Sequence, residues 1–219
     1  MYLSRLKLNP RHRRVQSELA RPYELHRTVM AAFPAILPPD ERVLFRVDTD
    51  ARSGQLALLV QSQYAPDWSH VQREPGYLLP GTAPEVKEVH LPLMSGQVLA
   101  FRLRANPTVK KKSHRDSKEL PVNGVRLGLA KEEEQRAWLE RKGEQHGFRV
   151  LWAQIIPEGM QVSYSGRGAG ARRLAHLAVR FEGLLQVADA EVFRQAVRDG
   201  IGSAKAFGFG LLSLARPTR

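Results

Sequence analysis

Gln97-Val98-Leu99-Ala100-Phe101-Arg102-Leu103-Arg104, near the middle of the chain, alternates apolar and basic residues toward its end. A period of two is typical of a β-strand with one face in a core and the other in solvent. The N-terminal stretch Tyr2–Leu8 alternates in a similar way and predicts a first strand rather than a signal peptide. These two strands, far apart in the sequence, indicate a chain of two similarly organised halves.

The first half continues with helices and a hairpin. Residues 10–33 form a predicted helical region that is interrupted at Pro22. Two stretches rich in Val, Leu and Phe, 42–48 and 56–62, predict a β-hairpin. A short last strand is expected at 86–91. The order strand, helix, strand, strand and a later strand is typical of a ferredoxin-like unit.

The second half repeats this order. After the strand at 97–104, its expected elements are a helix at 131–145, a strand at 148–156, a hairpin with a glycine-rich tip at 159–173, strands at 174–187, a helix at 190–199 and a strand at 211–214. Asp189 is a suitable N-cap for the later helix, and Gly200 ends it. We predict an α+β fold of two tandem ferredoxin-like domains, residues 1–91 and 92–219, each an antiparallel sheet with helices on one face.

The composition of the chain narrows the classes of molecule that we expect it to bind. The chain has 219 residues with 34 Lys and Arg against 22 Asp and Glu, a net charge of +12, which favours nucleic acid as a partner. A generally basic protein with no such partner is the alternative. The absence of cysteine excludes disulfides, thiolate zinc sites and cysteine nucleophiles, and favours the cytoplasm. No apolar run reaches the ~18–20 residues of a membrane span, so no membrane partner is expected.

A candidate catalytic pair lies on the predicted helix that begins at Pro22, a residue suited to the first helical position. Its apolar stripe consists of Leu25, Val29, Ala32 and Phe33. Tyr23 and His26 lie on one flank of this stripe, three residues apart, and Arg27 is close by. An imidazole, a phenol and a guanidinium suit metal-free RNA cleavage, in which a 2′-OH is deprotonated and a 5′-oxygen is protonated. The alternative is that both rings only pack or hydrogen-bond locally.

A metal site is not expected. The other six histidines form no close HxH or HxxxH pair, and no dense acidic cluster accompanies them. They are His12, His70, His90, His114, His146 and His176. We assign each of them to the surface or to packing, although His114 lies among lysines that suit RNA contact.

A glycine-rich segment near the C-terminus, residues 200–212, holds a second candidate site. Glycines let backbone N–H groups approach phosphate closely, and a lysine adds charge. The candidate phosphate ligands are Gly200, Gly202, Ser203, Lys205, Gly208 and Gly210. The segment matches neither the Walker A nor the Rossmann pattern. A purely structural tight turn is the alternative.

Further basic residues are candidates for RNA contact. Arg102 and Arg104 share one strand face because side chains alternate along a strand. The others are Lys110, Lys111, Lys112, Arg126, Arg141, Lys142, Arg172 and Arg173. We expect roughly half of these side chains to touch RNA and the rest to be solvated surface.

Several motifs in combination resemble the CasE family of CRISPR repeat-RNA (pre-crRNA) endoribonucleases, which are subunits of the type I-E Cascade complex. The resemblance runs over nearly the whole chain. It is carried by Met1–Pro10, Pro22-Tyr23-Glu24-Leu25-His26-Arg27, Phe101-Arg102-Leu103-Arg104-Ala105-Asn106-Pro107, Ala137-Trp138-Leu139-Glu140-Arg141 with Gly147-Phe148, and the segment 200–212.

This resemblance implies two RRM-type ferredoxin-like domains and an enzyme that needs neither metal nor small-molecule cofactor. Such an enzyme cuts the repeat at the 3′ base of its stem-loop, leaves 5′-OH and 2′,3′-cyclic phosphate ends, and stays on the crRNA with the other Cascade subunits. It also implies that Tyr23 and His26 are the catalytic pair, with His26 as the main acid/base. Arg27, Lys205 and the glycines would hold phosphates. The implied stem contacts are Arg104, Arg141, Lys142, Arg172 and Arg173.

Two alternatives remain open from the sequence. One is a non-catalytic RNA-binding scaffold subunit of the same kind of complex, which keeps the fold without turnover. The other is a DNA-binding protein, since charge alone does not distinguish the two nucleic acids.

Overall fold

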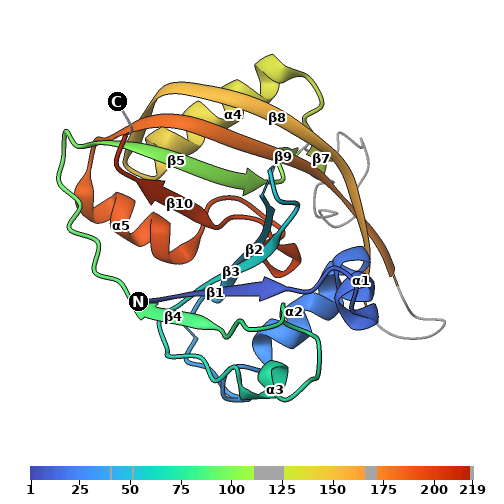
Figure 1. Cartoon of the computed structure of the whole chain (residues 1–219). Helices are drawn as coiled ribbons and strands as arrows, with labels where there is room; N and C mark the ends of the chain where they lie inside the picture. Colours follow the sequence, from blue (N-terminus) through green and yellow to red (C-terminus); the bar gives the residue numbers. More distant parts are fainter. Residues whose placement is uncertain (40, 51, 111–125, 166–171, 218–219) are drawn as a thin grey trace.

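The structure is a computed structural model that describes residues 1–217 apart from 40, 51, 111–125 and 166–171. Its framework is a pair of four-stranded antiparallel sheets, one built from each half of the chain (Figure 1). Helices cover one face of each sheet, and the opposite faces are turned toward each other. The expected α+β class with two ferredoxin-like units is confirmed.

The first sheet has the strand order β2-β3-β1-β4. Its elements are β1 (Tyr2–Leu8), α1 (Arg13–Ala20), α2 (Pro22–Met30), β2 (Leu44–Thr49), β3 (Leu56–Ser62), α3 (Ser69–Gln72) and β4 (Glu85–Glu88). Leu6 lies opposite Leu58 in the antiparallel β1–β3 pair, and both are buried. They pack against Leu25 and Val29 of α2 in one apolar cluster. The stripe expected on this helix is therefore its buried face.

The second sheet has the equivalent order, β10-β5-β9-β8. Its elements are β5 (Val98–Ala105), β6 (Thr108–Lys110), β7 (Arg126–Gly128), α4 (Glu132–Gln145), β8 (Phe148–Ser165), β9 (Arg172–Val187), α5 (Ala190–Asp199), the 3₁₀ turn η2 (Lys205–Phe207) and β10 (Leu212–Ala215). The strands β6 and β7 form a separate pair. Phe101 and Leu103 are buried in the helix-covered core. Because side chains alternate along a strand, Arg102 and Arg104 point to the opposite face of the sheet, which is turned toward the first sheet.

One expected boundary is wrong. The strand at 148–156 and the hairpin at 159–173 are not separate elements, because β8 continues through Pro157. The register with β9 shifts between Pro157 and Gly159, so a bulge accommodates the proline. Since β8 is an edge strand, a missing N–H is tolerated there. The result is one long β8–β9 hairpin, which extends from the second sheet down beside the first (Figure 1).

Polar groups of the first sheet join the two halves. Arg46 of β2 is 1% exposed, and its guanidinium donates to the carbonyl oxygens of Arg102 (3.3 Å) and Leu211 (3.1 Å). The Gln61 side chain of β3 donates to the carbonyl of Val197 at 2.7 Å. We keep the division between residues 91 and 92 as a proposal; it falls in the connection from β4 to β5. None of the described helices is both long and apolar enough to cross a membrane.

Candidate functional site

The helix α2 places the candidate catalytic pair. The ring centroids of Tyr23 and His26 are 5.9 Å apart, with the planes tilted by 36°. The helix is anchored from behind, because the buried Glu18 of α1 accepts a hydrogen bond from the Thr28 hydroxyl at 2.6 Å. Glu18 also accepts a hydrogen bond from the Tyr77 hydroxyl at 2.6 Å. The three-residue spacing therefore brings both rings to one flank of a firmly held helix.

His26 lies in an apolar, partly buried environment. Its ring stacks on Phe45 of β2 with centroids 6.1 Å apart and planes 23° from parallel. Burial lowers the pKa of His26 below its ordinary value of 6.5. Its buried Nδ1 has no hydrogen-bond partner in the described part of the chain. At neutral pH the ring is therefore uncharged, which is the form that accepts a proton from a hydroxyl group.

The glycine-rich segment meets α2 at this point. The Phe207 ring of η2 lies 6.2 Å from the Tyr23 ring. The structure also gives a packing reason for two glycines. A Cβ on Gly200 would come within 2.7 Å of Leu44, and one on Gly208 within 3.3 Å of Phe45; both residues have positive φ. These glycines therefore let the segment lie directly against β2, and their contact with phosphate stays a prediction.

A basic pocket of about 370 Å³ lies on one side of η2. Residues from three parts of the second half line it: Asn106, Thr108, Lys110, Trp138, Lys142, His146, Gly200, Gly202, Ser203 and Lys205. Burial lowers the pKa of Lys205; Arg42 and Lys142 lower it further, and Asp199 opposes them. The Ser203 hydroxyl is buried, and among the described residues it has no hydrogen-bond partner. This concentration of donors and cations suits an anionic ligand.

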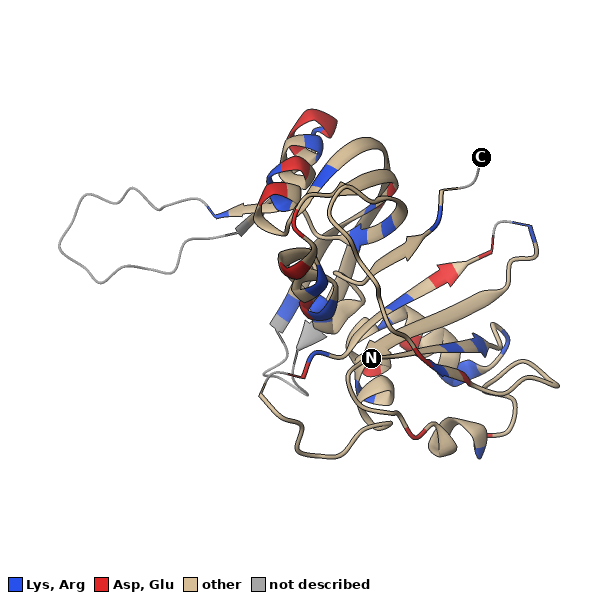
Figure 2. Cartoon of the chain, turned by 90° about the vertical axis from the view of Figure 1, so that its left-hand side faces the viewer, with Lys and Arg blue, Asp and Glu red and all other residues tan. Residues whose placement is uncertain are grey.

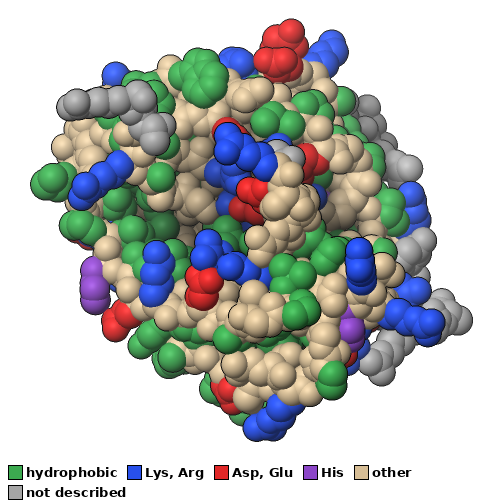
Figure 3. All heavy atoms as spheres, viewed as in Figure 1, with side chains coloured by type: hydrophobic (Ala, Val, Ile, Leu, Met, Phe, Trp, Pro, Cys, Tyr) green, Lys and Arg blue, Asp and Glu red, His purple; other side chains and the backbone are tan. Residues whose placement is uncertain are grey.

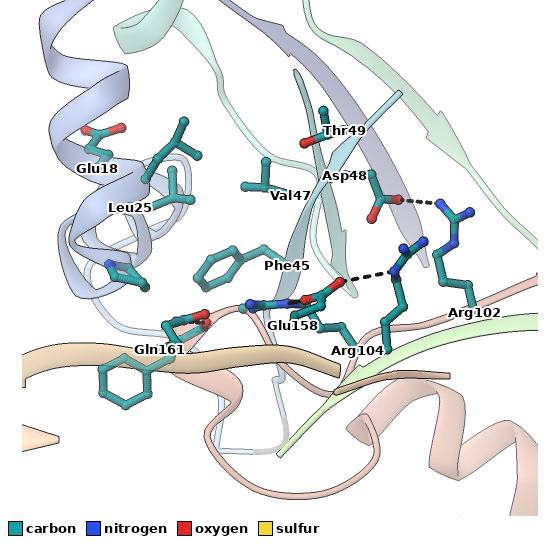
Figure 4. Close-up of a pocket in the computed structure, with 15 residues that line it drawn as sticks. Glu18, Leu25, Phe45, Val47, Asp48, Thr49, Arg102, Arg104, Glu158 and Gln161 are labelled. Atoms are coloured by element: carbon teal, nitrogen blue, oxygen red, sulfur yellow. Dashed lines mark hydrogen bonds and ion pairs between the residues drawn. The ribbon is translucent and has the colours of Figure 1, made fainter. Parts of the chain in front are cut away.

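An arginine cleft of about 360 Å³, which Phe207 of η2 also lines, lies between the two sheets. Its arginines are matched by carboxylates (Figure 4). Arg104 pairs with Glu158 at 2.6 Å, and Arg102 pairs with Asp48 at 3.4 Å. On the surface, basic and acidic side chains lie next to each other in the hollow between the two halves (Figure 3).

Further ion pairs complete the arginine cleft. Arg102 binds Glu182 at 2.7 Å, and Arg180 binds Glu158 at 3.1 Å. Burial would raise the pKa of Asp48, but hydrogen bonds and charge from Arg46 and then Arg102 outweigh it and lower that pKa. The arginine cleft thus satisfies its own charges.

The remaining predicted residues are dispersed, and Lys and Arg are spread over both halves of the molecule (Figure 2). Arg27 is exposed and pairs with Glu24 at 3.0 Å. Arg141 on α4 and Arg173 on β9 are exposed and line neither pocket. The candidates whose positions or side chains lie outside the described part are Lys111, Lys112, Arg126 and Arg172.

Three residues that line the basic pocket or join the two halves were not predicted from the sequence. His146, assigned to the surface or to packing, lines the basic pocket, and burial followed by the charges of Lys142 and Lys205 lowers its pKa. Trp138, Lys142 and His146 are spaced by four, so the helical period of α4 was the available signal. The local sequence carries no comparable signal for the interdomain role of Arg46. In the described chain, no group of three or more His, Asp or Glu residues is arranged to hold a metal ion.

Comparison with known proteins gives concordant matches. A family model described as "CRISPR associated protein" matches residues 1–216. The chain is 38% identical to the CRISPR-associated endoribonuclease Cse3 of Thermus thermophilus, covering 98% of this chain and 100% of that protein. It is 34% identical to the Cascade subunit CasE of Escherichia coli, over 88% of this chain and 91% of that one. A solved structure of Cse3 bound to a 19-nucleotide RNA matches with a TM-score of 0.81, at 38% identity, and covers 98% of this chain and 100% of that chain.

Proposed function

Because this chain belongs to the CRISPR-associated protein family of Cse3 and CasE, we propose that it is a metal-independent endoribonuclease of CRISPR precursor RNA. It cleaves each repeat at the 3′ base of the stem-loop and stays bound to the mature crRNA as a Cascade subunit. Its closeness to an endoribonuclease, a Cascade subunit and an RNA-bound structure supports this function.

One observation carries the chemical proposal: His26, whose pKa is lowered by burial, lies beside Tyr23 on the helix that meets the Lys205 loop. His26 takes the proton of the 2′-OH as the 2′-oxygen attacks phosphorus. The bond from phosphorus to the 5′-oxygen then breaks, and the His26 imidazolium returns its proton to that oxygen, directly or through Tyr23. The products are a 2′,3′-cyclic phosphate and a 5′-OH, so atoms and charges balance. Tyr23 orients the reacting groups or assists the proton transfer.

The basic pocket is the proposed phosphate-binding surface. Lys110, Lys142 and Lys205 supply charge there, and Ser203 supplies a hydroxyl group. Arg102 and Arg104 contact RNA only by exchanging carboxylate partners for phosphate, so we propose a smaller contribution from each of them. Arg27, Arg141, Arg173 and the other basic candidates remain proposed backbone contacts.

The decisive experiment is cleavage of the host's own CRISPR repeat RNA in EDTA, under single-turnover conditions. We expect the wild-type protein to cut at one site, and a 2′-deoxy substitution at the scissile nucleotide to abolish cutting while binding persists. His26→Ala should lower the rate roughly 10²–10⁴-fold, the usual range for a general acid or base. The exposed His90→Ala is the matched control.

Four outcomes count against the proposal. A requirement for Mg²⁺ would exclude the mechanism. An unchanged rate in His26→Ala would remove His26 from the chemistry. Tight RNA binding without cleavage would favour the scaffold subunit, and equal affinity for a DNA hairpin would favour the DNA-binding alternative.

A further inference from the structure

Phe207 contacts both the candidate catalytic pair and the outer part of the long hairpin, beyond the bulge at Pro157. On one side its ring centroid is 6.2 Å from that of Tyr23. On the other side it is 4.8 Å from the ring of His176, with the planes tilted by 37°. Both separations fall within the range of interacting aromatic pairs. Three rings from α2, η2 and β9 therefore form a continuous row.

The hairpin holds Phe207 through its backbone as well as its ring. Gln161 of β8 and His176 of β9 are directly opposite each other in the strand register. The Gln161 side-chain amide donates to the Phe207 carbonyl oxygen at 2.9 Å. A cross-strand pair thus fixes both the main chain and the ring of one residue.

His176 contacts Phe207 through its imidazole ring rather than through a hydrogen bond. Burial lowers its pKa, so the ring is uncharged at neutral pH. Its Nδ1 lies 3.4 Å from the Asn106 amide, whereas its buried Nε2 lacks a hydrogen-bond partner among the described residues. Because one ring nitrogen of His176 makes no hydrogen bond, packing against neighbouring rings fixes the position of this side chain. These neighbours include Phe209, with a centroid 6.0 Å away.

We propose that Phe207, clamped by Gln161 and His176, is a positioning residue that sets the orientation of the Tyr23 ring for cleavage. This inference rests on the proposed function in assuming that Tyr23 takes part in the reaction. It assigns a role to a residue that forms no part of the acid/base chemistry. The outer part of the hairpin, through Gln161 and His176, thereby helps to position a residue of the active site.

The physical reason is the freedom of the Tyr23 side chain. Tyr23 is only partly buried, and Phe207 supports one side of its ring. Without that support the phenol occupies several orientations, of which few are productive. A misplacement of about 1 Å at a reacting group costs up to about a hundredfold in rate. Substrate affinity changes little, because phosphate contacts supply most of it.

The kinetic test separates rate from binding. At saturating protein, we expect Phe207→Ala to lower the single-turnover rate about tenfold to a hundredfold, and its Kd for repeat RNA to change less than about threefold. Phe207→Tyr should retain most of the rate, since an aromatic ring suffices. Met160→Ala is the control, because this exposed neighbour of Gln161 points to the other strand face.

A double-mutant cycle tests the clamp itself. If Phe207 and His176 act as a unit, then Phe207→Ala with His176→Leu should be no slower than Phe207→Ala alone, within about twofold. If the rate losses of the two single variants multiply in the double variant, then Phe207 and His176 act independently, and the clamp is refuted. A fall in rate that follows thermal stability across all variants, Phe207→Leu included, would also overturn it.

A spectroscopic readout does not depend on cleavage. The protein has five tyrosines, so 3-fluorotyrosine labelling gives few ¹⁹F resonances, and Tyr23→Phe assigns one of them. Phe207→Leu should shift and broaden the Tyr23 signal, while Met160→Ala should leave it unchanged. A wild-type protein that cuts nothing, with this shift present, refutes the proposed function but leaves the clamp intact. An unchanged Tyr23 signal in a cleaving protein refutes the clamp.

Discussion

The basic pocket and the arginine cleft both border the 3₁₀ turn η2, the first at Lys205 and the second at Phe207, and their charges are balanced differently. In the arginine cleft, Arg102 and Arg104 are each paired with carboxylates within the chain. In the basic pocket, burial lowers the pKa of Lys205 and of His146, nearby cations lower each further, and Asp199 opposes them. We therefore propose that an anion binds more favourably in the basic pocket than in the arginine cleft, whose arginines already have carboxylate partners.

This difference shows that a tally of basic residues does not locate an anion-binding surface. The alternating Arg102 and Arg104 are conspicuous in the sequence, yet their partners come from distant strands. A surface guanidinium already held by a carboxylate gains little when it exchanges one anion for another. We therefore propose that the lysines of the basic pocket, which are less conspicuous in the sequence, make the main electrostatic contribution to RNA binding.

The largest expected effect comes from removing Arg46, the buried residue that pairs with Asp48 of the arginine cleft and bonds to the second half of the chain. Arg46→Ala should lower the free energy of unfolding by about 3–5 kcal/mol, because it leaves Asp48 with only the longer contact from Arg102 and leaves the carbonyls of Arg102 and Leu211 without this donor. Urea denaturation measures the loss. Arg5→Ala, which removes an exposed ion pair with Glu85, should cost less than about 1 kcal/mol. Similar losses in both variants would show that Arg46 does not join the two halves.

The next effect compares the two regions directly. Lys205→Ala should weaken binding of repeat RNA by roughly 1.5–3 kcal/mol, about tenfold to a hundredfold, through loss of a charge-assisted contact. Arg102→Ala should weaken it less than about threefold. Fluorescence anisotropy over a series of salt concentrations measures both, and the salt slope of Lys205→Ala should fall by about one unit. Equal losses would remove the distinction between the two regions.

A smaller effect is expected on the free energy of unfolding at acidic pH. The folded-state pKa of Asp48 lies below its ordinary value of 3.8, so the ionised carboxylate stabilises the fold above that pH. This contribution is lost as the pH falls through the folded-state pKa. Asp48→Asn should therefore show a shallower decline of unfolding free energy between pH 6 and pH 2 than the wild type. An identical decline would assign the acid sensitivity to other carboxylates.

The smallest effect is in the pH profile of cleavage. Because burial places the pKa of His26 below 6.5, more than half of the protein carries the neutral ring at pH 6.5. The single-turnover rate at that pH should then be within twofold of the plateau. Fluorescein-labelled repeat RNA at several pH values measures it, with binding kept saturated. A rate well below half of the plateau would show that RNA binding raises this pKa.

Local pattern was sufficient for most of the fold. The alternation in Tyr2–Leu8 and around Phe101 predicted both first strands, and Asp189 predicted the start of α5, where its side chain accepts from two backbone N–H groups. The three-residue spacing of Tyr23 and His26 predicted their shared flank. These features depend on neighbours in sequence, which a periodic pattern records.

The missed features depend on residues far apart in the chain. The break expected near Pro157 is a bulge because β8 lies at the edge of a sheet, and edge position is a property of the whole topology. The bonds from Arg46 to the carbonyls of Arg102 and Leu211 arise only where the two halves meet, and the clamp on Phe207 arises only where β8 and β9 meet η2. No local period encodes them.

The contacts of Arg46 have a consequence for exchanging parts between homologues. On the second half, two of its acceptors are the main-chain carbonyls of positions 102 and 211, and only the third, the Ser213 hydroxyl, belongs to a side chain. Any amino acid at the first two positions supplies the same oxygen. A chimaera that joins this first half to the second half of a homologue should therefore assemble with Arg46 in place, provided that position 213 carries a hydroxyl group.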